Sequence, residues 1–448
     1  MNSIRAIGAK VGGLKSEIVW VACGQIAAAL GSLIGVRLLT SSLKPSSYGE
    51  FALGSTVALL TQQALIGPLA AASLRFFGPS LEARRLAVFL AAVRRLLVST
   101  IAVTILLAAG VGTIIIAGNG RRWALLLTAS TLLALLLGWQ STLDSLQNAA
   151  RHRKICALHD ALGSWTRYGV AAALVWLVRP TSSIAMLGFA TGIAIVLISQ
   201  THFYRRDIVR LASDEELPDP SDVRRMTGKM WAYAWPFATW GMFSWAQLVS
   251  DTWGLQLARG RATVGIYNAL YQVGYYPVLI ATNAMVQLLA PLLFARAGDG
   301  SDAKRLWESQ RAAAIAAYIS VLLACLGAIL AFTLRNVIFH YLVGARYRPG
   351  SGLLAPLVLA GGMFAAAQIA ATSTMAQYRT EKLILPKILT SVAGAIVNVA
   401  AALQWGLPGV VYGNLAFSAL YLVWMLHLNH VGRGWRVIQP DDGGTVGI

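Results

Sequence analysis

The sequence predicts an all-α, polytopic membrane protein of about 12 transmembrane helices. Hydrophobic residues make up 57% of the 448 residues and charged residues only 12%, and the mean hydropathy is +0.62. Soluble domains are far less apolar. Basic residues gather in the connections between long apolar stretches, and their distribution predicts how the chain crosses the membrane.

Twelve stretches satisfy the requirement of about 20 mostly apolar residues for a bilayer-spanning helix. The first is too long for a signal-peptide core and lacks a small-residue cleavage site, so we expect it to be retained. The predicted spans lie near 18–39, 48–74, 96–117, 123–143, 155–178, 184–204, 231–257, 264–293, 312–334, 352–375, 383–405 and 409–430.

The charges of the connections predict that both termini are cytoplasmic. With that orientation, the inside segments hold 26 of the 37 Lys and Arg residues and the outside connections hold 9. Lys and Arg resist translocation, so this asymmetry over short loops sets the topology. The net charge of +19 then indicates anionic lipid headgroups as partners, and no nucleic acid is needed to explain it.

A polar segment at 205–229 divides the predicted spans into two sets of six. Its six acids offset its six bases, and its prolines disfavour a continuous helix. We therefore predict an N-terminal six-helix lobe at 1–204, a cytoplasmic connector at 205–229, and a C-terminal six-helix lobe with a short tail at 230–448.

The second span of each lobe opens with a similar pattern. Residues 48–53 (YGEFAL) and 264–269 (VGIYNA) each place a glycine and an aromatic before a long apolar helix that contains proline. Parallel repeats of this kind occur in alternating-access transporters, where the substrate site lies between the lobes. The alternative is that a glycine with an aromatic marks only the membrane interface.

Several segments resemble bacterial polysaccharide-biosynthesis flippases of the O-antigen type, which move lipid-linked oligosaccharides. The resemblance covers nearly the whole length and rests on these segments: Gly24 to Leu39, Leu43 to Pro45, Tyr48 to Leu53, Asp251 to Leu255, Val264 to Ala269, Leu289 to Pro291, and Gly406 to Gly413. It implies membership of the multidrug, oligosaccharidyl-lipid and polysaccharide (MOP) exporter superfamily. Members have two six-helix bundles around a central cavity.

Four charged residues inside predicted spans are candidates for transport roles: Arg37, Asp160, Arg167 and Asp251. Each buried charge opposes membrane insertion by about 2.5–3.5 kcal/mol. Arg167 lies halfway along its span, too deep to reach either interface easily. Its planar fork of donors suits a lipid pyrophosphate, and the alternative is a structural pair with Asp160, about 10 Å away along the same helix face.

Arg37 and Asp251 lie at similar depths before the two repeated glycines, on opposite lobes. They could form a periplasmic gate that closes when the cavity opens inward. The alternatives are an interfacial arginine at position 37 and, for Asp251, a proton or sodium site or a helix–helix hydrogen bond.

Further candidates are residues that could contact the headgroup or the sugars. Arg75 lies at the inner end of a span, where it could attract an anionic headgroup or simply follow the topology rule. Amides bind sugar hydroxyls but also join helices, and indoles stack on sugars. This set comprises Gln25, Gln62, Gln247, Gln272, Trp240 and Trp245.

The predicted function is translocation of an undecaprenyl-pyrophosphate oligosaccharide from the inner to the outer leaflet of the bacterial inner membrane, for polysaccharide assembly. We expect no enzyme activity and no cofactor, although an H⁺ or Na⁺ gradient could drive transport. Cys23, Cys156 and Cys325 are scattered, so we also expect no disulfide and no metal site. A monomer is expected to suffice, with glycan polymerases as possible partners. One alternative is a MATE-like cation-coupled drug antiporter. Another, in a different class, is a membrane glycosyltransferase or polymerase. The second is disfavoured because the longest outer segment, 335–351, has three basic residues and no acid that could serve as a catalytic base.

Overall fold

The structure is a computed structural model that describes the backbone of residues 2–118, 120–297, 302–376 and 381–431. Within these, side chains are described except at 2–19, 240, 283–284, 287–288, 290–292, 294–297, 303, 373–376, 381–387 and 429–431. The helices are α1 Asn2–Ser42, α2 Pro45–Thr61, η1 Gln62–Ile66, α3 Gly67–Glu82, α4 Leu86–Ala117, α5 Arg121–Ala149, α6 Arg153–Leu177, α7 Ser182–Asp207, η2 Val209–Ala212, α8 Pro220–Arg259, α9 Arg261–Ala297, α10 Ala303–Thr333, α11 Arg335–Leu342, η3 Ala345–Leu353, α12 Leu354–Ala376 and α13 Glu381–Val431.

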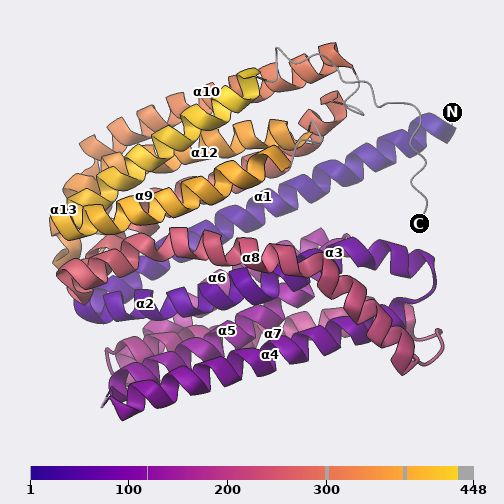
Figure 1. Cartoon of the computed structure of the whole chain (residues 1–448), viewed down its shortest axis with the longest axis horizontal. Helices are drawn as coiled ribbons and strands as arrows, with labels where there is room; N and C mark the ends of the chain where they lie inside the picture. The colour runs from indigo at the N-terminus through magenta and orange to yellow at the C-terminus, as the bar shows by residue number, and fades with distance from the viewer. Residues whose placement is uncertain (1, 119, 298–301, 377–380, 432–448) are drawn as a thin grey trace.

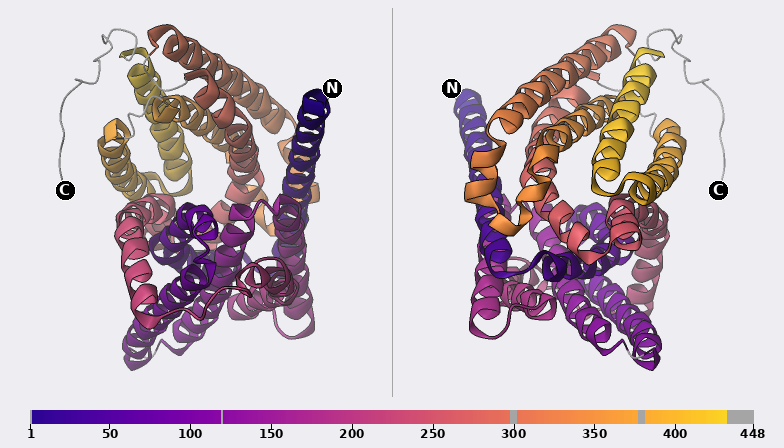
Figure 2. Two further views of the ribbon diagram at one scale, coloured as in Figure 1. Left: turned by 90° about the vertical axis from the view of Figure 1, so that its right-hand side faces the viewer. Right: turned by 90° about the vertical axis from the view of Figure 1, so that its left-hand side faces the viewer.

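The long helices run roughly parallel to one another and form two groups (Figure 1). In the first, α1 packs on α6, α6 on α7, and α5 on both α2 and α7. In the second, α12 packs on α9, α10 and α13. Helix α8 packs on α13 but also contacts α3 and α4, so it runs along the boundary between the groups (Figure 2).

All twelve predicted spans lie on helices. Residues 48–74 pass through α2, η1 and α3 as one continuous rod, and the last two spans form α13, which bends at Gly406 with a φ of 63°. In the described parts of the chain, eight helices are long and apolar enough to cross a membrane. The predicted polytopic all-α fold is confirmed.

Local structure differs from the prediction at two places. The connector is shorter than 205–229, because α7 continues to Asp207 and α8 already begins at Pro220. Proline fits the first turn of a helix, where its missing N–H leaves no bond unmade. The second place is Gln62–Ile66, a π-helical turn just before Pro68, and such turns frequently occur at functional sites.

Small residues on α1 allow α6 to approach it closely, as small-residue helix interfaces do in membranes. A Cβ atom added at Gly24 would lie 2.8 Å from the Ala157 carbonyl oxygen, and one at Gly31 would lie 3.0 Å from the Trp165 ring. Ser32 and Ser164 hydrogen-bond across the same interface at 3.1 Å. The small residues of α1 therefore form a helix-packing surface for α6.

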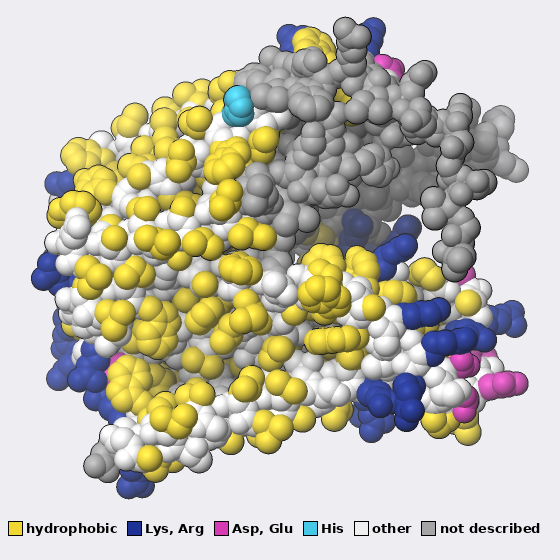
Figure 3. Space-filling model, viewed as in Figure 1, with side chains coloured by type: hydrophobic (Ala, Val, Ile, Leu, Met, Phe, Trp, Pro, Cys, Tyr) yellow, Lys and Arg dark blue, Asp and Glu magenta, His cyan; other side chains and the backbone are white. Residues whose placement is uncertain are grey.

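The two ends of the molecule differ. At one end, α1 finishes at Ser42 and the two groups are joined through α2 and α9, which begin there and pack on each other; we call this the closed end. At the opposite, open end, the surface is hollowed between the groups, and Lys and Arg side chains lie along one side of the hollow (Figure 3).

Candidate gate and buried polar sites

The closed end is built on a symmetric crossing of α2 and α9. A Cβ atom added at Gly49 would clash with the Arg261 carbonyl oxygen and lie 2.9 Å from the Gly265 nitrogen. One added at Gly265 would clash with the Pro45 carbonyl oxygen and lie 3.0 Å from the Gly49 nitrogen. The two glycines that define the sequence repeat therefore lie against each other. Gly49 contacts the backbone of Arg261, four residues before Gly265, and Gly265 contacts the backbone of Pro45, four residues before Gly49.

A buried carboxylate ties the two groups together beside this crossing. The side chain of Glu50 is only 2% exposed, and its Oε1 accepts a hydrogen bond from Arg261 of α9 at 2.5 Å. Its Oε2 accepts from Arg122 of α5 at 2.7 Å and from the Ser182 hydroxyl of α7 at 2.8 Å. Three donors compensate the buried charge, and only the bond to Arg261 links the two groups.

A second link joins the end of α1 to the segment between α11 and α12. The Arg37 guanidinium donates to the Val343 carbonyl oxygen. The Gly344 N–H donates to the Thr40 hydroxyl at 2.9 Å, and the Tyr347 hydroxyl donates to the Leu43 carbonyl at 3.0 Å.

The predicted contact between Arg37 and Asp251 is absent from this conformation. None of the ion pairs among the described side chains joins them. The reason is that Arg37 finds a carbonyl acceptor at Val343, whereas Asp251 is buried among polar groups of α8, α9 and α13.

Asp251 lies at the centre of a buried hydrogen-bonded cluster. Its carboxylate accepts from the Tyr267 hydroxyl and, at 2.6 Å, from the Thr252 N–H. Asn414 donates to the Tyr267 oxygen at 3.0 Å. Asn398 lies within hydrogen-bonding distance of the Asn414 side-chain oxygen at 3.3 Å, so residues far apart in sequence converge on one acid.

This cluster also contains an unsatisfied acceptor. The side-chain oxygen of Asn398 is buried without a hydrogen-bond partner, although its amide nitrogen lies 3.4 Å from the Ser250 hydroxyl. Carboxylate, amide and hydroxyl oxygens are the ligands that hard cations prefer. Among the described residues no group of three His, Cys, Asp or Glu side chains could hold a metal, so Asp251 with its amide neighbours is the best candidate for a cation.

Arg167 is half-buried on α6, and its Nε donates to the Gly163 carbonyl at 2.8 Å. Helix α7 crosses at this level, since a Cβ atom at Gly192 would lie 2.7 Å from the Arg167 Cα. Asp160 is exposed on the same helix, and none of the ion pairs found among the described side chains joins it to Arg167. The two side chains therefore form no direct salt bridge in this conformation, although they interact electrostatically.

The remaining candidates have varied surroundings. Gln62 donates to the Ser141 hydroxyl at 2.9 Å from within the π-helical turn, and Gln247 accepts from Ser391 at 2.8 Å. Trp245 donates from its indole nitrogen to the Thr56 carbonyl at 2.8 Å and so fastens α8 to α2. Arg75 is exposed, Gln25 and Gln272 are half-buried, and the side chain of Trp240 lies outside the described residues.

Sequence reasoning missed the buried acid Glu50. It appears in the repeat motif only between a glycine and an aromatic, and Arg122 and Arg261 appear only as outer charges in the topology count. The available signal was an acid at the start of a span, in a chain whose predicted outer connections hold nine basic residues and no acid.

Comparison with known proteins identifies the fold. No family model matches the chain, and no curated protein sequence matches it. The chain is similar to the lipid II flippase MurJ in an inward closed conformation, with a TM-score of 0.69 and 12% identity over 92% of this chain and 87% of that one.

It is also similar to multidrug resistance MATE family transporters of the MOP superfamily. For an inward-facing conformation the TM-score is 0.65, with 13% identity over 91% of this chain and 94% of that one. For an outward-facing conformation it is 0.60, with 13% identity over 93% and 95%. The chain thus has the fold of these transporters, and it superposes better on the inward-facing MATE form than on the outward-facing one.

Proposed function

We propose that the protein is a flippase that moves an undecaprenyl-pyrophosphate-linked oligosaccharide across the bacterial inner membrane by alternating access. The observation that carries this proposal is the hollow between the helix groups, which is bordered by basic side chains at the open end (Figure 3) and shut at the other by the α2–α9 crossing. With both termini cytoplasmic, the open end faces the leaflet in which such a substrate is made.

The charge of the open end suits an anionic headgroup. Arg75 on α3 and Arg94 and Arg95 on α4 are exposed near the predicted cytoplasmic ends of their spans, where they would attract a pyrophosphate from the inner leaflet. Arg167 lies deeper, and its terminal nitrogens remain available for a bidentate contact with phosphate oxygens. Release on the other side requires the Glu50–Arg261 and Arg37–Val343 contacts to separate.

A MATE-like antiporter of drugs or small molecules is the second candidate. The observation that favours it is the buried Asp251 cluster, because a single acid surrounded by amides can exchange a proton or Na⁺ for a cationic substrate. In the flippase, the same cluster would couple transport to an ion gradient. A membrane glycosyltransferase has less support, because the structural relatives are transporters.

The test is reconstitution of the purified protein in liposomes with fluorescently labelled undecaprenyl-pyrophosphate oligosaccharide in one leaflet. Its arrival in the other leaflet is followed by dithionite quenching. Loss of a charge-assisted hydrogen bond of about 1.5–3 kcal/mol should slow transfer by about ten- to a hundredfold in Arg167→Ala. Arg167→Lys should retain part of the rate, and the exposed Arg121→Ala on α5 is the matched control.

Parallel liposomes carry a fluorescent cationic drug and a proton gradient. Drug movement without lipid movement would replace the flippase by the antiporter. Equal lipid transfer by wild type and Arg167→Ala, at equal protein levels, would remove Arg167 from the substrate path. The same assay shows whether the purified chain suffices as a monomer or needs a glycan polymerase or another biosynthetic partner.

A further inference from the structure

The closed end carries a cavity that lies outside the hollow between the helix groups. Helix α11 and the 3₁₀ helix η3, which together span 335–353 and which we call the closed-end hairpin, fold back on each other between α10 and α12. Phe339 and Tyr347 are at most 1% exposed and anchor the hairpin on the core. A cavity of about 440 Å³ opens between its two arms.

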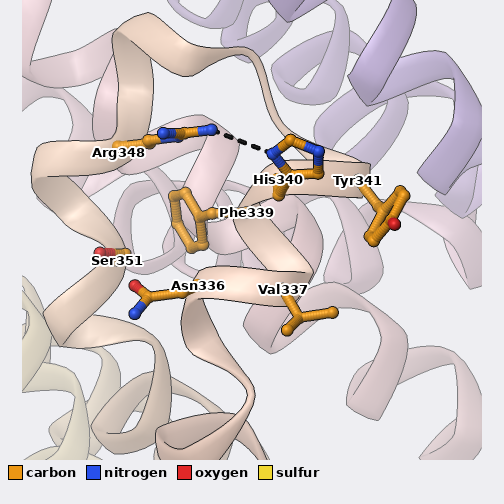
Figure 4. A pocket seen from close by; sticks show the side chains of 7 residues that line it. All are labelled: Asn336, Val337, Phe339, His340, Tyr341, Arg348 and Ser351. Atoms are coloured by element: carbon orange, nitrogen blue, oxygen red, sulfur yellow. Dashed lines mark hydrogen bonds between the residues drawn. The ribbon is translucent and has the colours of Figure 1, made fainter.

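The cavity has the size and the lining of a binding site. Ligand pockets typically have volumes of about 300–1,000 Å³ with a few convergent polar groups. Here Asn336 and His340 come from α11, and Arg348 and Ser351 from η3 (Figure 4). The Arg348 guanidinium donates to the His340 Nδ1 at 3.1 Å across the mouth of the cavity.

The closed-end hairpin carries positive charge that no acidic side chain of its own neutralises. Residues 335–353 contain three arginines and no acid. None of the ion pairs among the described side chains involves Arg335, Arg346 or Arg348. The partner of Arg348 is an imidazole nitrogen that accepts only in its neutral form, so this guanidinium faces the cavity with donors free for an anion.

The rim of the cavity is apolar and exposed. Val337 is 51% and Tyr341 69% exposed, whereas Phe339 on the same helix is buried. An amphipathic helix with an exposed aromatic at the end of a membrane-spanning helix lies at the level of the lipid headgroups. An anion that reaches the Arg348 side chain there is most simply a headgroup phosphate.

The cavity is directly connected to the second link between the helix groups. Three residues of the hairpin bond to the end of α1: Val343 and Gly344 in the turn between the two arms, and Tyr347 at the start of η3. A ligand that draws Arg348 away from His340 therefore acts on the same short segment that holds α1.

We propose that the closed-end hairpin binds the phosphate of a lipid headgroup through Arg348, His340 and Asn336. This extends the proposed function, on which it rests for the presence of a phosphate-bearing substrate. The phosphate belongs either to the pyrophosphate of the translocated lipid as it emerges or to a membrane phospholipid.

The test uses a single cysteine in the cavity as a reporter. Ser351→Cys is introduced into the full chain with the three native cysteines replaced by serine, and its rate of labelling by a maleimide is measured. The first arm adds sodium pyrophosphate to protein in a phosphate-free maltoside detergent. The second compares nanodiscs of phosphatidylglycerol with nanodiscs of an uncharged, phosphate-free galactolipid.

A probe at twice its dissociation constant should slow the labelling by about threefold, because only the free fraction reacts. Arg348→Gln should abolish this protection, and Arg348→Lys should retain part of it. Gly352→Cys is the matched control, since residue 352 is exposed and a Cβ there meets no atom within 4 Å; its labelling should not change.

Protection by pyrophosphate in detergent supports recognition of the phosphate group alone. Protection only in phosphatidylglycerol supports recognition of a phospholipid headgroup. The proposal is overturned if neither probe protects Ser351→Cys or if protection persists in Arg348→Gln. Because labelling measures binding and not transport, its failure leaves the flippase assay unaffected, and a failed flippase assay leaves this measurement valid.

Discussion

At the scale of single residues, the sequence identifies the unusual charges but not their partners. Asp251 is conspicuous because an acid inside a span is costly. Tyr267 and Asn414 stand 16 and 163 positions further on, and only the folding of α13 onto α8 brings the asparagine to the acid. The expected partner, Arg37, has the right depth and sign but lies on α1, where Val343 satisfies it.

The Asp251 cluster gives a testable prediction for ion coupling. A cation bound there stabilises the fold by RT ln(1 + [L]/Kd), about 2.7 kcal/mol at a hundred times the dissociation constant. We expect sodium chloride, compared with choline chloride, to raise the Tm of the purified protein and to have no effect on Asp251→Asn. Glu82→Gln, an exposed acid at the end of α3, is the control and should respond like wild type.

A proton at the same site gives a different result. The Tm of the wild type would then be the same in sodium chloride and choline chloride. The rate of transport would depend on pH in the wild type but not in Asp251→Asn. A variant that keeps both the sodium response and the pH response of the wild type contradicts any coupling role for this acid.

At the scale of helices, the prediction from sequence was most successful where hydrophobic length decides the outcome. All twelve predicted spans lie on helices. The π-helical turn at Gln62–Ile66 and the short helices of 335–353 were not predicted, because apolar length carries no information about a local change of hydrogen-bond register. The repeat identified Gly49 and Gly265 as a pattern, but it did not predict that the two glycines lie against each other.

The crossing of α2 and α9 is tested by adding one methyl group. In Gly49→Ala the new Cβ meets the backbone oxygen of Arg261, which cannot rotate away, so the helices must separate. Overpacking of this kind costs about 1–3 kcal/mol. Thermal unfolding in detergent should show a lowered Tm, and Gly265→Ala should give a similar loss because its surroundings mirror those of Gly49.

Gly169→Ala on α6 is the matched control, since a Cβ there meets nothing within 4 Å. Alanine is the better helix former by about 0.8–1 kcal/mol, so the control should equal or exceed the wild type in stability. If Gly49→Ala is as stable as Gly169→Ala, the close crossing is not a determinant of the closed end.

At the scale of the whole molecule, the two groups of helices meet at the closed end and along α8, which packs on α13 and also contacts α3 and α4. The contacts that close this end are few and differ in kind: a backbone crossing at Gly49, an ion pair from Glu50, and hydrogen bonds between α1 and the closed-end hairpin. The proposed alternating-access cycle requires these contacts to break together, so each should contribute a modest share of the free energy that favours the closed conformation.

The Glu50–Arg261 bond is the contact whose share can be measured most directly. A charge-assisted hydrogen bond contributes about 1.5–3 kcal/mol, so Glu50→Gln should raise the ratio of outward-open to closed molecules by about ten- to a hundredfold. Spin labels are attached at Lys44→Cys and Ala262→Cys, both exposed beside the crossing, in a chain without native cysteines. Double electron–electron resonance between the labels then measures the separation of α2 and α9.

Arg122→Gln provides the control, because Arg122 binds the same carboxylate from α5, on the same side of the boundary as Glu50. Its loss weakens the anchoring of Glu50 but leaves the bond to Arg261 in place, so the distance distribution should keep its short component. Glu50→Gln should instead gain a longer component. An unchanged distribution in Glu50→Gln would mean that the glycine crossing and the α1 contacts hold the end shut without the ion pair.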